Sequence, residues 1–141
     1  MYPNPTLRGR FTQEGLTTAS GPRIVVMCFD RLDRDLGEAI AALAANDHAR
    51  AHDRLCHAQE IVHELLCMLD LDAWEHAPRL AAIYRYVMEL LTRSNVKKSA
   101  GEAIEARGFL AELAEAFREA LVARPVAAER AGTPTQFSVR A

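Results

Sequence analysis

Residues 24–43, IVVMCFDRLDRDLGEAIAAL, carry the pattern that decides the fold. Their apolar side chains recur at steps of three and four residues, in the series Val25, Phe29, Leu32, Leu36, Ile40 and Leu43. This spacing places them on one face of an α-helix and leaves most of the intervening charges on the other face. The stretch therefore predicts an amphipathic helix that packs against other helices.

The same spacing of apolar residues returns in three later segments. In chain order, the three series are Ala51, Leu55, Ala58, Val62, Leu65 and Leu69; then Leu80, Ile83, Tyr84, Val87, Leu90 and Leu91; then Ala103, Leu110, Leu113, Phe117 and Leu121. We expect helices at about 21–45, 47–70, 77–94 and 98–124, with Asn46 and Asp47 ending the first and capping the second. Helices joined by connections this short pack as antiparallel neighbours. The sequence predicts an all-α protein, an antiparallel up-and-down four-helix bundle formed by residues 20–124.

The two ends of the chain lack the helical pattern. Residues 1–19 contain Pro3, Pro5, Gly9 and Gly15 among scattered apolar side chains, which is typical of a mobile N-terminal arm. Residues 125–141 are small and polar, and we expect a disordered tail there.

The composition excludes several functional classes. The chain has 141 residues, of which 50% are hydrophobic and 26% charged, as in an ordinary globular domain. Its net charge of −2 gives no electrostatic reason to expect nucleic acid or an anionic membrane as a partner.

The cysteines and the apolar runs indicate the compartment. Cys28, Cys56 and Cys67 form no CxxC pair and lie within apolar helical patterns, which favours a reducing environment. The first residues lack the charged and apolar regions of a secretory signal. The longest apolar run, residues 24–29, is far too short to cross a membrane. We therefore expect a cytoplasmic protein without membrane insertion.

Two groups of residues have the spacing of metal ligands. Glu60 and His63 match one half of a di-iron helix motif, but no second copy of that motif exists in the chain. His48, His52 and Cys56 lie four residues apart in succession, a spacing that suits Zn²⁺, but no fourth ligand is evident. A polar helix face explains both groups better. With no Gly-rich phosphate loop and no pair of nucleophile and base, we expect no metal, no cofactor, no catalytic residues and no enzymatic activity.

Tyr84 and Tyr86 indicate apolar surface on more than one side of a helix. Two residues apart, they point about 200° away from each other, and Tyr84 shares the phase of the core residue Val87. A second apolar strip then comprises Ile61 and Leu65 on the second helix with Tyr86 and Leu90 on the third. Such a strip either widens the core or contacts a partner.

Four motifs follow one another along the chain: Met1-Tyr2 with Phe11 and Thr18-Ala19-Ser20; the apolar run 24–29 followed by Asp30; AQEIVHEL at 58–65 followed by Leu69-Asp70; and Leu80, Tyr84, Tyr86-Val87-Met88 and Ser94-Asn95. In this order and at this spacing, they resemble the flagellar export chaperones of the FliS type. The chain departs from the family pattern in four places: Phe11 replaces the usual Tyr, Gly21-Pro22 replaces Pro-Glu, the glycines usual before the third helix are absent, and Phe117 stands where Trp is common.

The resemblance implies a binding module. Such chaperones hold the disordered C-terminal segment of flagellin as helices in apolar grooves, which prevents polymerisation in the cytoplasm, and they present flagellin to the flagellar export gate. On this basis the second apolar strip is interpreted as a groove, and the predicted client-binding residues are Ile61, Leu65, Tyr86, Leu90 and Asn95. A C-terminal helix cap is the other interpretation of Asn95.

The last two predictions concern the role of the N-terminal arm and the identity of the client. Tyr2 and Phe11 belong to an arm with too many apolar side chains to remain in solvent, so we predict that it covers the groove until a client displaces it. The alternative function is a helical adaptor of the export system with another client, such as an anti-sigma factor. A metal-binding helical bundle is a third alternative.

Overall fold

The computed structural model describes residues 21–72 and 75–131. The predicted arm, with Tyr2 and Phe11, lies outside the described residues, as do residues 132–141. Within the described ranges the chain forms four helices: α2 (Gly21–Ala44), α3 (His48–Met68), α4 (Ala77–Lys97) and α5 (Ala100–Ala131).

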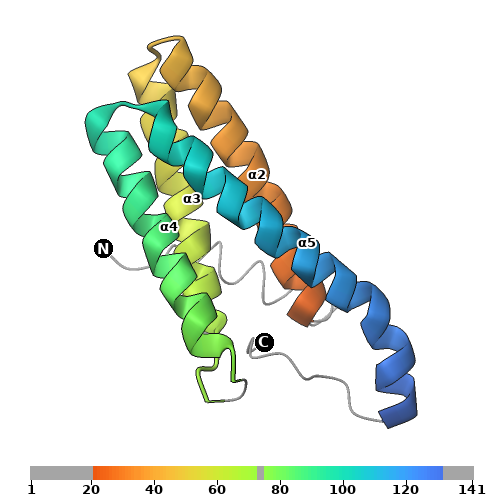
Figure 1. Ribbon diagram of the computed structural model, residues 1–141. Helices are drawn as coiled ribbons and strands as arrows, with labels where there is room; N and C mark the ends of the chain where they lie inside the picture. Colours follow the sequence, from red (N-terminus) through yellow and green to blue (C-terminus); the bar gives the residue numbers. More distant parts are fainter. Residues whose placement is uncertain (1–20, 73–74, 132–141) are drawn as a thin grey trace.

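The four helices form a closed ring of neighbours. α2 packs against α3 and α5, and α4 packs against the same two helices. Successive helices run in opposite directions, as Figure 1 shows. The predicted antiparallel four-helix bundle is confirmed.

The turn between α2 and α3 forms where the sequence predicts it. Asn46 adopts a left-handed backbone conformation with a φ of 57°, which Asn tolerates better than most residues. The carboxylate of Asp47 then accepts a hydrogen bond from the backbone N–H of Arg50 at 3.2 Å. This cap satisfies one of the free N–H groups at the start of α3.

The end of α4 differs from the prediction, which placed it at 94. The helix continues to Lys97, and Lys98 leaves it with a left-handed φ of 52°. Ser94 is fully buried, and its hydroxyl donates a hydrogen bond to the backbone oxygen of Ser99. Asn95 bonds to α3 instead of ending the helix. Tertiary contacts therefore hold this polar segment in the helix.

The end of α5 also differs. A helix end at 124 and a disordered tail from 125 were predicted, but residues 125–131 are helical. Pro125 has no N–H to donate to the preceding turn. The residues after it include Ala127, Ala128 and Ala131, and Ala has the highest helix propensity of all residues. Figure 1 shows this part of α5 continuing beyond the other three helices.

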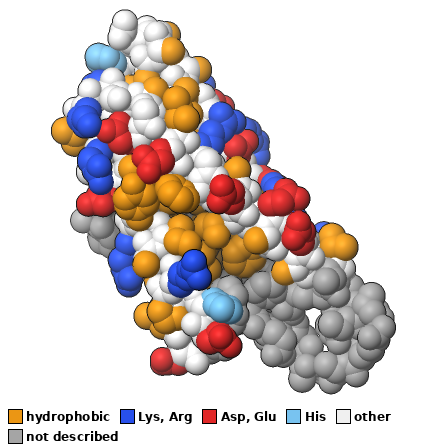
Figure 2. Space-filling view, in the orientation of Figure 1, with side chains coloured by type: hydrophobic (Ala, Val, Ile, Leu, Met, Phe, Trp, Pro, Cys, Tyr) orange, Lys and Arg blue, Asp and Glu red, His pale blue; other side chains and the backbone are white. Residues whose placement is uncertain are grey.

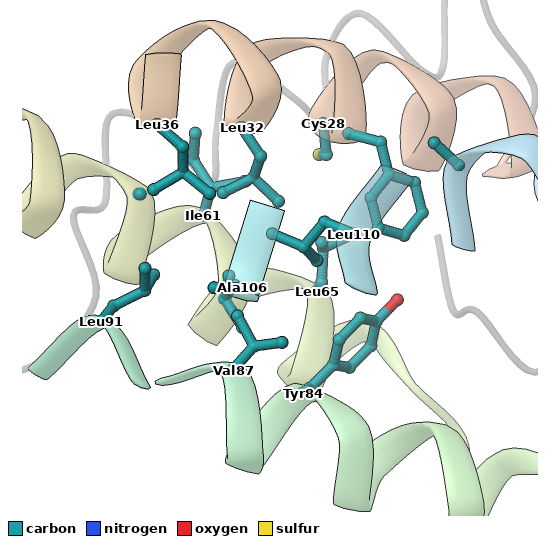
Figure 3. Packing of buried hydrophobic residues seen from close by; sticks show 14 of the residues in the cluster. Cys28, Leu32, Leu36, Ile61, Leu65, Tyr84, Val87, Leu91, Ala106 and Leu110 are labelled. Carbon is teal, nitrogen blue, oxygen red and sulfur yellow. The ribbon is translucent and has the colours of Figure 1, made fainter. Parts of the chain in front are cut away.

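All four helices contribute to one hydrophobic core (Figure 3). The side chains labelled there are Cys28, Leu32 and Leu36 from α2; Ile61 and Leu65 from α3; Tyr84, Val87 and Leu91 from α4; and Ala106 and Leu110 from α5. Phe29 on α2 and Phe117 on α5 extend the core, with ring centroids 5.5 Å apart. Burial of each large side chain contributes about 1.5–3 kcal/mol, so this core dominates the stability of the bundle.

Charged side chains link α2 to both of its neighbours. On the α5 side, Arg107 binds Asp33 with 2.8 Å between Nε and Oδ1, and this hydrogen bond holds the pKa of Asp33 below its ordinary value. On the α3 side, Asp35 is only 2% exposed and contacts the side chains of His57 and Arg54. A buried carboxylate requires such partners, so these contacts favour one alignment of α2 with α3.

Gly108 offers a test of helix stability. Nothing lies within 4 Å of a Cβ atom added at this position, which is inside α5 and exposed. We expect Gly108→Ala to raise the free energy of unfolding by about 0.5–1 kcal/mol, because Ala has less backbone freedom to lose. Urea unfolding followed by circular dichroism measures the change.

Gly37 is the matched control. A Cβ atom at Gly37 would approach Nη2 of Arg107 to 3.0 Å, so the guanidinium that binds Asp33 must move. We expect Gly37→Ala to give no gain in stability. A larger gain from Gly37→Ala than from Gly108→Ala would contradict this account of the two positions.

The buried thiol of Cys28 should make the free energy of unfolding depend on pH. Burial, and then the negative charge of Glu64, raise the pKa of the Cys28 thiol from 9.0 to about 12. As the pH rises above 9, the unfolded chain releases this proton and the folded chain retains it, so folding becomes less favourable. Between pH 9 and 10 the wild type should lose about 1 kcal/mol that Cys28→Ala does not lose. Urea titrations of both proteins at each pH measure the difference, and equal losses would exclude this role for Cys28.

Candidate functional site

Two aromatic side chains form an exposed pair where α4 meets α5. Tyr86 on α4 is 39% exposed and Phe109 on α5 is 38% exposed. Their rings pack edge to face, with centroids 5.7 Å apart and an angle of 84° between the ring planes. Aromatic pairs favour this geometry. The described residues contain no other aromatic side chain this exposed.

Half-buried apolar residues extend this pair on both helices. Ile83 precedes Tyr86 by three residues and Leu113 follows Phe109 by four, so each lies on the same side of its helix as the aromatic residue. We call Ile83, Tyr86, Phe109 and Leu113 the seam patch. Figure 2 shows hydrophobic side chains gathered over α4 and α5 on this face of the molecule. An exposed patch of this kind on a soluble protein is typical of a binding surface.

A hydrogen bond across the seam fixes the position of Tyr86. Its hydroxyl donates to Oε2 of Glu105 on α5 at 2.8 Å. This bond to a carboxylate raises the pKa of Tyr86 above its ordinary value, which already lies well above neutral pH. With the ring held by Phe109 and the hydroxyl by Glu105, little side-chain freedom is left to lose when a partner binds.

α4 and α5 lie closest together near the short connection that joins them. Lys97 at the end of α4 pairs with Glu102 at the start of α5, with 2.6 Å between Nζ and Oε2. Figure 1 shows the two helices separating with distance from this connection.

Three of the predicted client-binding residues lie in the core. Ile61, Leu65 and Leu90 are 0%, 2% and 1% exposed, and Figure 3 shows Ile61 and Leu65 among the packed side chains. In the closed bundle these three side chains therefore do not line an open groove. The physical reason is that α3 and α4 each bury apolar side chains against two neighbours. The second apolar strip mainly widens the core.

The other two predicted residues keep exposed surface but lie on different sides of α4. Tyr86 contacts α5, whereas Asn95 contacts α3. The side-chain amide of Asn95 donates to Nδ1 of His52 at 2.8 Å, and its oxygen accepts a hydrogen bond from Lys98 at 2.9 Å. Asn95 therefore links two helices, and Lys98, not Asn95, is the C-cap residue of α4. The structure does not bring Tyr86 and Asn95 into one site.

The possible metal ligands form pairs. Cys56 lies 3.5 Å from Nε2 of His52, and Cys67 lies 3.5 Å from Nε2 of His63. Within residues 21–72 and 75–131, no group of three or more His, Cys, Asp or Glu side chains is placed to hold a metal ion. Partial burial raises the pKa of Cys56, followed by the charges of Glu60 and Asp53, so this thiol is not activated as a nucleophile.

Sequence reasoning missed Phe109. The predicted core series of the fourth helix includes Leu110 and omits Phe109, which directly precedes it. The available signal was an aromatic residue outside the phase of the core positions, next to Gly108. Only the fold shows that it meets Tyr86.

None of the helices in the described residues has both the length and the apolar character required to span a bilayer. This result concerns the described part of the chain.

Comparisons with known proteins identify relatives of this chain. The sequence model of a family described as "Flagellar protein FliS" matches residues 6–124. The chain is also similar to the protein named "Flagellar secretion chaperone FliS" from Bacillus subtilis (strain 168). The identity is 24% over 111 residues, which cover 79% of this chain and 83% of the relative. The family match covers all four predicted core series and all four residues of the seam patch.

Substitution by Asp distinguishes core from surface at two positions. Leu90→Asp places a carboxylate in the core, and we expect it to lower the free energy of unfolding by at least about 4 kcal/mol. Phe109→Asp leaves the new carboxylate at the surface, and we expect a smaller loss of about 1–2 kcal/mol from the aromatic pair and the partly buried ring. Thermal unfolding followed by circular dichroism compares the two. Similar melting temperatures for both variants would mean that Leu90 is not a core residue.

Proposed function

This chain belongs to the flagellar protein FliS family, and from that premise we propose that it is a flagellar secretion chaperone whose client docks on the seam patch. The relative from Bacillus subtilis is named as a chaperone of this kind. We further propose that the client is the C-terminal segment of flagellin, that binding occurs in the cytoplasm, and that the complex is delivered to the flagellar export gate. The protein acts by binding and has no catalytic step.

The exposed pair of Tyr86 and Phe109 is the observation that supports a client surface at the seam. An amphipathic helix binds a protein by placing apolar side chains against a surface of this kind. Aromatic residues at the centre of a contact commonly supply most of the binding free energy. Here the pair is already ordered by a hydrogen bond to Glu105, which reduces the entropy lost on binding.

The burial of the core constrains how a client binds. Side chains such as Leu65 and Leu90 are out of reach unless the helices separate. Separation would expose many large side chains at about 1.5–3 kcal/mol each. A client that binds the surface avoids this cost. We therefore propose that the bundle stays closed and that the client adds a helix to its outside.

A peptide of the flagellin C-terminal segment tests this function. We expect Phe109→Asp to weaken binding at least about thirtyfold in isothermal titration calorimetry, because loss of an aromatic anchor costs about 2 kcal/mol or more. Val96→Asp is the matched control. Val96 is also apolar and 77% exposed on α4, but it lies ten residues from Tyr86, about 15 Å along the helix.

The control should bind within about twofold of the wild type, since surface changes away from a site alter free energies by only about 0.5 kcal/mol. Equal losses in both variants, or full binding by Phe109→Asp, would exclude the seam patch as the client surface. Binding of another flagellar protein at the same patch, without binding of flagellin, would show that the client is different.

A further inference from the structure

Two arginines border the seam patch on α4. Arg79 precedes Tyr86 by seven residues, and Arg93 follows it by seven. Seven residues are close to two helical turns, so all three lie along one side of α4. Both arginines are exposed. Glu89, three residues after Tyr86, lies on the same side and pairs with Arg93, so Arg79 supplies the excess positive charge. We call this side the basic border.

Two glutamates border the patch on α5. Glu105 precedes Phe109 by four residues and Glu112 follows it by three, which places them on the side of α5 that carries Phe109. Both are exposed. We call this side the acidic border.

The positive charges nearby on α5 are directed elsewhere. Arg107 and Arg118 bind Asp33 and Asp30 on α2, on the opposite side of α5 from the seam. They therefore do not neutralise the acidic border.

Among the described residues, no ion pair joins the arginines of the basic border to the glutamates of the acidic border. Lys97 and Glu102 form an ion pair across the seam beside the α4–α5 connection. Arg93 pairs with Glu89 on its own helix, with 3.3 Å between Nη2 and Oε1. Among the described residues, Arg79 and Glu112 have no ion-pair partner. Charge of opposite sign thus remains available on the two sides of the patch.

We propose that the two borders fix the direction in which the client helix lies on the seam patch. An amphipathic helix has two flanks beside its apolar stripe, and turning the helix end for end on a surface exchanges them. A client with an acidic flank toward α4 and a basic flank toward α5 matches both borders in one direction only. Electrostatic complementarity of this kind sets orientation more than affinity. This inference rests on the proposed function, because it takes the patch as the client site.

Two designed peptides test the proposal with the full-length protein. They have the same composition and the same apolar stripe, but their acidic and basic flanks are exchanged, and each carries a nitroxide spin label at its N-terminus. NMR line broadening of backbone amides then shows which end of α4 lies near the label. We expect one peptide to broaden signals at the Ala77 end and the other at the Lys97 end. The preference should be about tenfold at low salt and smaller at high salt, since exposed pairs are weak and screened.

A double variant is the control. Arg79→Glu with Glu112→Arg keeps the net charge and removes from each border the excess of the sign that it carries in the wild type. It also preserves the bond between Tyr86 and Glu105 and the pair of Arg93 with Glu89. We expect either peptide to broaden both ends of α4 about equally in this variant.

The outcomes separate the two proposals. If both peptides shift the signals of Tyr86 and Phe109 but broaden the same end of α4, the directional inference is wrong and the client surface stands. If the double variant keeps the wild-type preference for one end of α4, the directional inference is also wrong and the client surface also stands. If neither peptide shifts those signals, and the flagellin peptide does not shift them either, both proposals fail.

Discussion

The burial of every helix against two neighbours is the constraint on which the rest of this structure depends. The ring of α2, α3, α4 and α5 requires apolar side chains over a wide part of each helix. That requirement places Ile61, Leu65 and Leu90 in the core, together with Tyr84. It also determines what remains outside. Tyr86 and Phe109 contact each other at the edge of the α4–α5 packing and keep more than a third of their surface exposed.

The periodicity of the sequence was sufficient for the fold but insufficient for the site. Steps of three and four residues predict a helix and its main buried side, and the Asn46-Asp47 turn could be predicted from its residue types. Periodicity does not reveal how many sides of a helix its neighbours cover. The apolar strip containing Leu90 was therefore interpreted as surface, although it is core. Phe109 became a candidate site residue because it contacts Tyr86, which lies 23 positions earlier in the chain. No local sequence pattern predicts that contact.

Local residue types were also insufficient to predict where α4 and α5 end. Ser94 and Asn95 are residue types that often end helices, yet burial of one and a bond from the other to α3 keep both within α4. Pro125 indicated an end to α5, but the helix continues through it to Ala131. In each case a contact or a run of strong helix formers outweighed a local signal.

The distribution of charge connects the fold to the proposed function. Acidic residues on α2 bind arginines from α5, including the pair of Asp33 with Arg107. The same side chains that fix the alignment of α5 thus leave its seam side acidic, opposite the arginines of α4. In the proposed function, the exposed aromatic pair between borders of opposite charge holds an amphipathic client helix while the bundle stays closed.

Amide hydrogen exchange of the full-length protein, with and without the flagellin C-terminal segment, tests the central claim most directly. Exchange reports local opening along the whole backbone. A client that binds outside a closed bundle should increase protection in the parts of α4 and α5 around Tyr86 and Phe109, and should leave the protection of core amides near Ile61 and Leu65 unchanged. Faster exchange of those core amides, or new protection confined to the side formed by α2 and α3, would contradict it.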